Sequence, residues 1–80
     1  MTDEFKTEDL PLACYIIARR ALPFLGCLKN GGGRACFLFA APAQAGEALE
    51  AEYMSGGQVS ALEYHAALRQ LRKAMHVVGF

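Results

Sequence analysis

The segment from Phe24 to Ala41 reads FLGCLKNGGGRACFLFAA and carries the strongest structural signal in the chain. Its two apolar runs, residues 24–28 and 35–41, flank the polar segment Lys29–Arg34, in which three consecutive glycines follow an asparagine. Glycine and asparagine adopt the positive φ angles that tight hairpin turns require. The sequence therefore predicts a β-hairpin. A phosphate-binding loop is disfavoured because these glycines precede a strand and not a helix.

The second strand of this hairpin is apolar on both faces, since Phe37, Leu38 and Phe39 are consecutive and strand side chains alternate between faces. A two-stranded ribbon is too small to be stable alone. We expect helices to cover one face, and either helices or the hairpin of a second copy to cover the other. The predicted register joins three cross-strand pairs: Lys29 with Arg34, Cys27 with Cys36, and Phe24 with Phe39.

Three helices are predicted outside the hairpin. Asp9 is a good N-cap for a helix over residues 10–21, with Pro11 in its first turn. A short acidic helix follows over residues 47–54, and Ser60 with Glu63 forms the capping-box pattern that opens a long C-terminal helix. The apolar seam of that last helix consists of Tyr64, Leu68, Leu71, Met75 and Val78.

These elements define one α+β domain over residues 1–80, with an ordered core at about 5–78. Its order is a polar N-terminal segment, helix, hairpin, short helix and long helix, with the hairpin packed on the helices. Hydrophobic residues make up 54% of the 80 residues, and a domain of this length buries only about 60–65% of its unfolded surface. We therefore expect a homo-oligomer, most simply a two-fold dimer. The candidate interface residues are Phe37, Leu38, Phe39, Leu68, Leu71 and Met75.

The formal net charge is zero, so the chain as a whole lacks the positive field of a typical nucleic-acid-binding protein. One local cluster departs from this balance. Arg69, Arg72, Lys73 and His76 recur on one side of the last helix, next to the apolar seam, and we call them the basic row. A row of this kind can contact phosphates, and Arg19, Arg20 and Arg34 are candidate additions. The alternative is a solvated helix end, where cations complement the dipole.

The other classes of function find less support in the sequence. Cys14, Cys27 and Cys36 are odd in number and form no C-x-x-C pair, which disfavours a disulfide framework and a zinc site. No motif places a nucleophile beside either histidine, His65 or His76. We therefore expect no metal, no cofactor and no enzymatic activity. Neither a membrane span nor a signal peptide is apparent, so a cytoplasmic protein is predicted.

A resemblance covers residues 5–76. It rests on Phe5-Lys6-Thr7-Glu8-Asp9-Leu10-Pro11-Leu12-Ala13, the glycine-rich hairpin, the acidic helix ending in Tyr53, and the motif Tyr64-x-x-x-Leu68-Arg69-x-Leu71-Arg72. The chain resembles a family of small uncharacterised bacterial and phage proteins, a domain of unknown function with an N-terminal F-x-T-x-D-x-x-L-A pattern. The resemblance implies no activity and transfers no functional residue, but its context of mobile elements favours nucleic acid.

Two functions follow as hypotheses. The first is a small non-enzymatic module that binds a protein or a second copy of itself. The second is a nucleic-acid-binding accessory protein that uses the basic row. Four cations give only a modest salt-dependent affinity unless an oligomer duplicates them.

Overall fold

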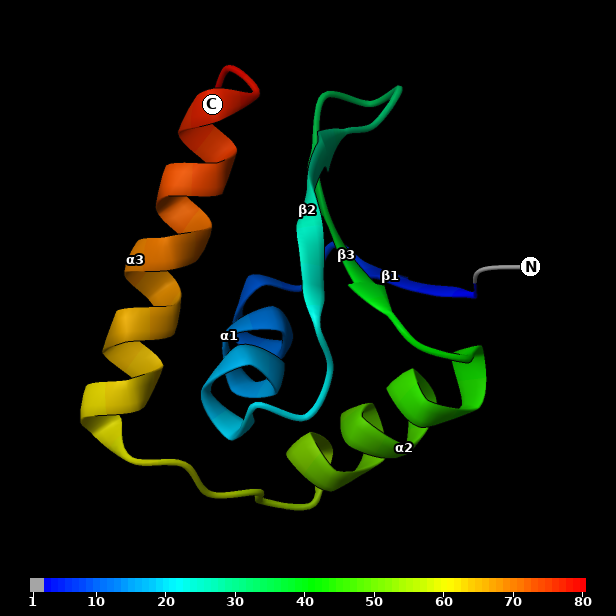
Figure 1. Cartoon of the computed structure of the whole chain (residues 1–80), viewed down its shortest axis with the longest axis vertical. Coiled ribbons are helices and arrows are strands. Elements are labelled where there is room, and N and C mark those ends of the chain that lie inside the picture. Colours follow the sequence, from blue (N-terminus) through cyan, green and yellow to red (C-terminus); the bar gives the residue numbers. More distant parts are fainter. Residues whose placement is uncertain (1–2) are drawn as a thin grey trace.

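A computed structural model describes residues 3–80 and shows an α+β fold of three helices and one antiparallel three-stranded sheet (Figure 1). The fold class predicted from the sequence is confirmed. The elements in chain order are β1 (Glu4–Thr7), α1 (Leu10–Arg19), β2 (Phe24–Lys29), β3 (Ala35–Ala40), α2 (Ala43–Met54) and α3 (Ala61–Val77).

Strand β1 was not predicted, because the sequence pattern indicated only a polar segment before the first helix. It pairs antiparallel with β3, so that β3 lies in the centre of the sheet in the order β1-β3-β2. Phe5 lies opposite Phe39, and Lys6 lies opposite Leu38. The hairpin is therefore completed by a third strand of its own chain, which supplies the partner that a two-stranded ribbon lacks.

The hairpin itself is confirmed, but its register differs from the predicted one. Cys36 pairs with Leu28 and Cys27 pairs with Phe37, so the predicted pairing of the two cysteines is wrong. They lie on opposite faces of the sheet, since they occupy alternating positions. A bulge between Phe24 and Gly26 restores the predicted pairing of Phe24 with Phe39, and Gly26 supplies the φ of 149° at this bulge.

The turn of the hairpin is organised by one side chain. The Oδ1 atom of Asn30 accepts hydrogen bonds from the amides of Gly32 and Arg34, at 2.9 and 3.0 Å. The amide of Asn30 also donates to the carbonyl oxygen of Arg34, at 2.8 Å. Of the three glycines, only Gly33 has a positive φ, 78°. The shift of register by one residue follows from this closed turn, which pairs Lys29 with Ala35.

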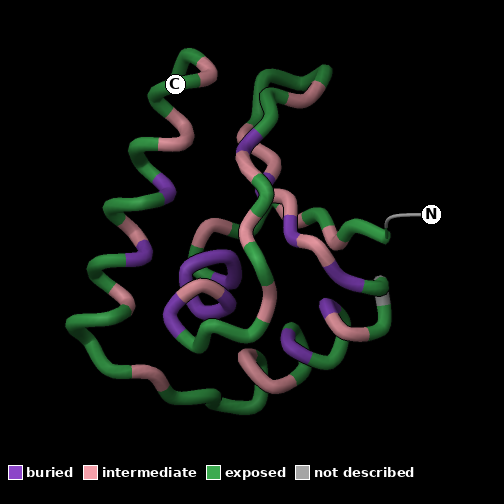
Figure 2. The backbone as a smooth tube through the Cα atoms, in the orientation of Figure 1, coloured by how far each residue is buried: buried purple, intermediate pink, exposed green. Residues whose placement is uncertain are grey.

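The core lies between the inner face of the sheet and the helices, and Figure 2 shows the buried positions concentrated on α1. Phe37 and Phe39 are 1% and 0% exposed and pack in one cluster with Leu12, Ile16 and Leu71. Phe37, Phe39 and Leu71 were predicted interface residues, and that prediction is wrong for all three. They are buried within a single chain because the helices cover the inner face of the sheet.

The helix boundaries differ from prediction by a few residues. Helix α1 begins as expected, with the amide of Leu12 donating to the Asp9 carboxylate at 3.2 Å. It ends at Arg19 instead of residue 21, because Arg20 takes a left-handed conformation with φ 55°. Helix α2 starts at Ala43, one turn earlier than predicted. That extra turn brings Gly46 against the ring of Phe5, where any Cβ atom would overlap it.

Candidate nucleic-acid interface

Helix α3 is fixed at both ends by its own sequence. The amide of Glu63 donates to Ser60 Oγ at 3.0 Å, which confirms the predicted N-cap. At the other end Gly79 has a φ of 100°, and the amide of Phe80 donates to the carbonyl oxygen of Met75 at 3.0 Å. The Lys29 ammonium lies 5.1 Å from the centre of the Phe80 ring, so the C-terminal end of α3 lies beside β2.

One stripe of α3 packs against the protein. Ala67 and Leu71 are buried, at 2% and 0% exposure. Leu68 and Met75, two further predicted interface residues, are half-buried and pack against the same core. The predicted apolar seam is therefore chiefly an intramolecular contact of α3.

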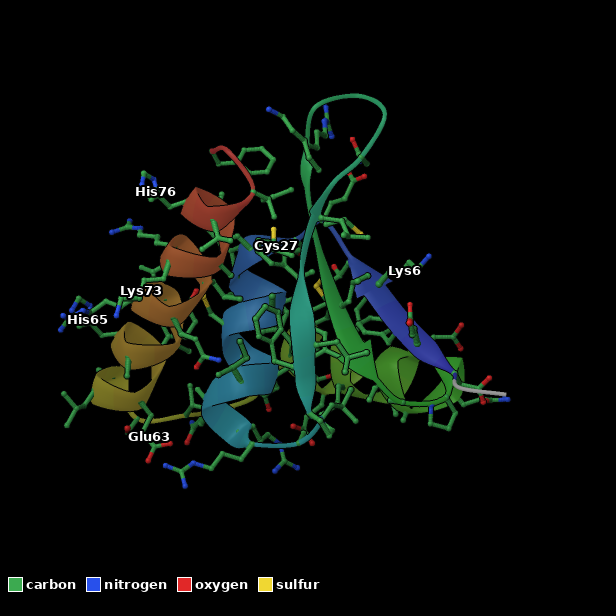
Figure 3. All side chains as sticks on the ribbon, turned by 45° about the horizontal axis from the view of Figure 1, so that its top comes forward. Lys6, Cys27, Glu63, His65, Lys73 and His76 are labelled. Atoms are coloured by element: carbon green, nitrogen blue, oxygen red, sulfur yellow. The ribbon has the colours of Figure 1, made fainter. Side chains whose placement is uncertain are left out.

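The basic row lies on the opposite side of α3. All four of its side chains, Arg69, Arg72, Lys73 and His76, are exposed. At about 100° per residue, the middle of the row lies roughly 180° around the helix from Ala67 and Leu71. One edge of the row still adjoins the half-buried part of the packed stripe, since Arg72 lies about 40° around the helix from Leu68. Figure 3 shows Lys73 and His76 projecting from α3 away from the remainder of the protein.

Sequence reasoning assigned no role on this surface to His65, which the structure places there. His65 is exposed and projects outward together with Lys73 and His76 (Figure 3). Its spacing of four residues before Arg69 was the signal that could have found it. We call Arg69, Arg72, Lys73, His76 and His65 together the basic face. Four of its members, with Val77, line a shallow hollow of about 540 Å³.

No acidic side chain of α3 faces this surface, since Glu63 is the helix's one acid and lies on another side near the N-terminus. The ion pairs of residues 3–80 are made elsewhere: Arg19 binds Glu52, and Arg34 lies 3.7 Å from Glu8. The charges of the basic face are therefore free to contact a ligand.

The three other arginines considered with the row do not join it. Arg19 and Arg34 are engaged by the carboxylates named above. Arg20 is exposed and lines a groove of about 230 Å³ between α1 and α3, together with Leu62, Ala66 and Gln70. It lies beside the basic face but not on it.

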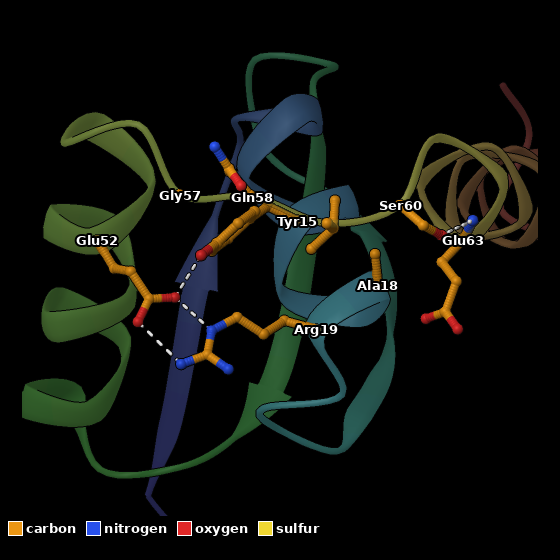
Figure 4. A pocket seen from close by; sticks show the side chains of 9 residues that line it. Tyr15, Ala18, Arg19, Glu52, Gly57, Gln58, Ser60 and Glu63 are labelled. Carbon is orange, nitrogen blue, oxygen red and sulfur yellow. Dashed lines mark hydrogen bonds and ion pairs between the residues drawn. The ribbon is translucent and has the colours of Figure 1, made fainter.

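A second polar cluster, between α1 and α2, is shown in Figure 4. The Glu52 carboxylate accepts hydrogen bonds from the Tyr15 hydroxyl and from Arg19, one of them from Arg19 Nη2 at 2.9 Å. Arg19 and Tyr15 together lower the pKa of Glu52 to about 2. The hydrogen bond to Glu52 raises the pKa of Tyr15. The three side chains are hydrogen-bonded to one another and join α1 to α2, so we interpret the cluster as a structural contact.

A cleft of about 520 Å³ adjoins this cluster, and Gly57 forms part of its wall. A Cβ atom at Gly57 would overlap the Tyr15 side chain, so glycine lets the α2–α3 linker pass close to that ring. The hydroxyl groups that line the cleft are already engaged in structural contacts: the Tyr15 hydroxyl donates to Glu52, and Ser60 Oγ accepts from the Glu63 amide as the N-cap of α3.

The three cysteines differ in burial. Cys14 and Cys27 are buried, and burial raises the pKa of each thiol, which lowers its reactivity. Cys36 is half-exposed on the outer face of the sheet. Within residues 3–80, no three His, Cys, Asp or Glu side chains come together as metal ligands.

Comparison of the chain with known protein families, with curated proteins and with solved structures finds no match. The resemblance noted from the sequence stays a prediction. No helix in the described part of the chain is long and apolar enough to cross a membrane.

Proposed function

We propose that this protein is a small non-enzymatic binding module whose ligand is a nucleic acid, contacted by the basic face of α3. The observation that carries the proposal is the placement of five exposed nitrogen-bearing side chains opposite the packed stripe of that helix. Phosphates are the groups that such a row of cations contacts best.

The position of the row along α3 argues against a mere helix-end effect. Cations stabilise a helix through its dipole only within about the last turn. Only His76 lies in that turn, while Arg69 and Arg72 come one to two turns earlier. Solubility alone is also a poor explanation, because a solvated helix commonly mixes both signs of charge in i, i+4 pairs.

The zero net charge is compatible with this proposal, because the charges are segregated. Helix α2 has no basic residue and carries the exposed acids Glu47 and Glu50. Figure 1 shows α2 on the other side of α1 from α3. A locally positive surface attracts a polyanion even where the total charge vanishes.

The test is the salt dependence of binding, measured by fluorescence anisotropy with a labelled DNA duplex. Three to four phosphate contacts should give a slope of log K against log salt of about −3 to −4. The affinity should therefore fall by roughly two orders of magnitude between about 50 and 200 mM salt. A slope near zero, or no binding at the lower salt concentration, would contradict the proposal.

Self-association is a second candidate function, and the outer face of the sheet favours it. Leu25 and Leu28 are 51% and 52% exposed there, beside the half-buried Leu38 and Cys36. The chain exposes 5184 Å², about a tenth more than the roughly 4,700 Å² typical of a monomer of 8.7 kDa. Of the interface residues predicted from sequence, Leu38 is the one that faces this surface. A second copy of the chain is its proposed occupant.

Sedimentation equilibrium tests this candidate. The wild-type chain should be largely dimeric at about 100 µM, and Leu28→Asp should be monomeric, because a carboxylate on the contact face would lose its hydration on association. Leu62→Asp is the matched control, since Leu62 is 79% exposed on α3. The control should associate like wild type. A wild-type mass of 8.7 kDa at that concentration would exclude the dimer.

A further inference from the structure

The side chains of the basic face do not form a single line along α3. They are spread around its axis. Arg72 and Lys73 are adjacent in sequence, so they lie about 100° apart around the helix axis and mark its two flanks. His65, His76 and Arg69 lie between them, about 20°, 40° and 60° beyond Arg72. The face therefore has a central ridge with a long cationic side chain on either side.

This arrangement matches a groove with phosphates on both rims. The ridge from His65 to His76 extends about 16 Å along the axis, at about 1.5 Å per residue. The major groove of B-form DNA is about 12 Å wide and admits an α-helix. A helix lying in it can direct Arg72 to one strand and Lys73 to the other, with Arg69 pointing at the base edges.

The rest of the protein leaves room for such an approach. Helix α3 forms one margin of the molecule, with α1 and the sheet all on its inner side (Figure 1). The remaining side chain of the hollow on this face, Val77, is 84% exposed. No other element of residues 3–80 therefore stands in front of the basic face.

Other nucleic acids fit this surface less well. Proteins that bind single strands stack bases on aromatic side chains, and the one aromatic residue of α3, Tyr64, packs against the core. Phe80 lies beyond the helix, and the Lys29 ammonium lies over one face of its ring. Double-stranded RNA has a deep, narrow major groove that excludes a helix.

We propose that α3 inserts into the major groove of B-form duplex DNA, with Arg72 and Lys73 contacting the phosphates of opposite strands. This inference rests on the proposed function and names the ligand class of the same site.

The test compares three labelled probes of one sequence and of about 16 nucleotides or base pairs: duplex DNA, single-stranded DNA and duplex RNA. The intact protein should bind duplex DNA at least about tenfold more tightly than either alternative. If no probe binds, the proposed function itself fails. If all three bind alike, or single-stranded DNA or duplex RNA binds best, only the groove proposal fails.

Single variants test the two flanks. Arg72→Ala and Lys73→Ala should each lower the affinity for duplex DNA and each reduce the salt slope by about 1. Gln70→Ala is the matched control, because Gln70 is exposed on α3 outside the basic face and should leave both quantities unchanged. A slope that changes in only one of the two flank variants would mean that the helix touches one strand, and the groove proposal would be overturned.

Discussion

Replacing Phe39 with alanine should lower the free energy of unfolding by about 3–5 kcal/mol, the usual cost of removing a fully buried phenylalanine. Phe39 has no exposed surface, and its ring centre lies 6.5 Å from that of Phe5 and 5.5 Å from that of Phe24. The variant loses aromatic contacts with both neighbouring strands, β1 and β2. The free energy of unfolding of so small a domain is rarely more than about 5 kcal/mol. We therefore expect the variant to be largely unfolded at 25 °C.

Leu38→Ala is the matched control for this prediction. Leu38 is the next residue along β3 but lies on the outer face, where it is only half-buried. Its replacement should cost about 1–2 kcal/mol, less than that of Phe39, because Leu38 lies outside the core cluster and keeps part of its side chain exposed. Urea denaturation followed by circular dichroism at low micromolar concentration measures both. Equal losses for the two variants would show that the faces of β3 are assigned wrongly.

The pair Phe39 and Leu38 also shows what the sequence could and could not predict. The apolar run Phe37-Leu38-Phe39 correctly indicated a strand with two apolar faces. It did not indicate the third strand that pairs with β3, because β1 consists of only four residues, Glu4–Thr7, two of them charged. Four residues are too few for an alternation of polar and apolar side chains to predict a strand. The pairing of β1 with β3 also depends on tertiary contacts, which the local sequence does not show.

The hairpin register was missed for a different reason. The turn residues were recognised, but the carbonyl and side chain of Asn30 close a loop that is one residue longer than the simplest one. The bulge at Gly26 then compensates farther along the strand. Glycine at a bulge and glycine in a turn look alike in sequence, since both meet the need for a positive φ.

The basic row was predicted more completely than the fold around it. Helical periodicity alone places Arg69, Arg72, Lys73 and His76 on one side of α3, and all four are exposed there. Periodicity could not show that Arg19 and Arg34 pair with carboxylates elsewhere and so do not join the row. Those ion pairs join residues far apart in the chain, as Arg19 and Glu52 do.

Removing the three permanent charges of the basic face should have the largest effect on binding. The variant Arg69→Ala, Arg72→Ala, Lys73→Ala loses up to three phosphate contacts, which should reduce the salt slope by about 3. At about 50 mM salt the affinity for duplex DNA should fall by roughly a thousandfold. Folding should be little affected, because all three side chains are exposed and alanine favours helix.

The matched control removes three cations from other surfaces: Lys6→Ala, Arg20→Asn and Arg34→Ala. It has the same net charge as the triple variant, and asparagine tolerates the left-handed conformation of Arg20. Lys6 lies on the far side of the molecule from Lys73 (Figure 3). If binding depended on total charge alone, both variants would lose affinity equally.

The role of α3 as the nucleic-acid interface is tested by the affinity of these two variants for duplex DNA, measured side by side at low salt. We expect the control to bind within about threefold of wild type and the basic-face variant to show almost no binding. Equal affinities for the two variants would contradict the assignment of α3 as the nucleic-acid interface.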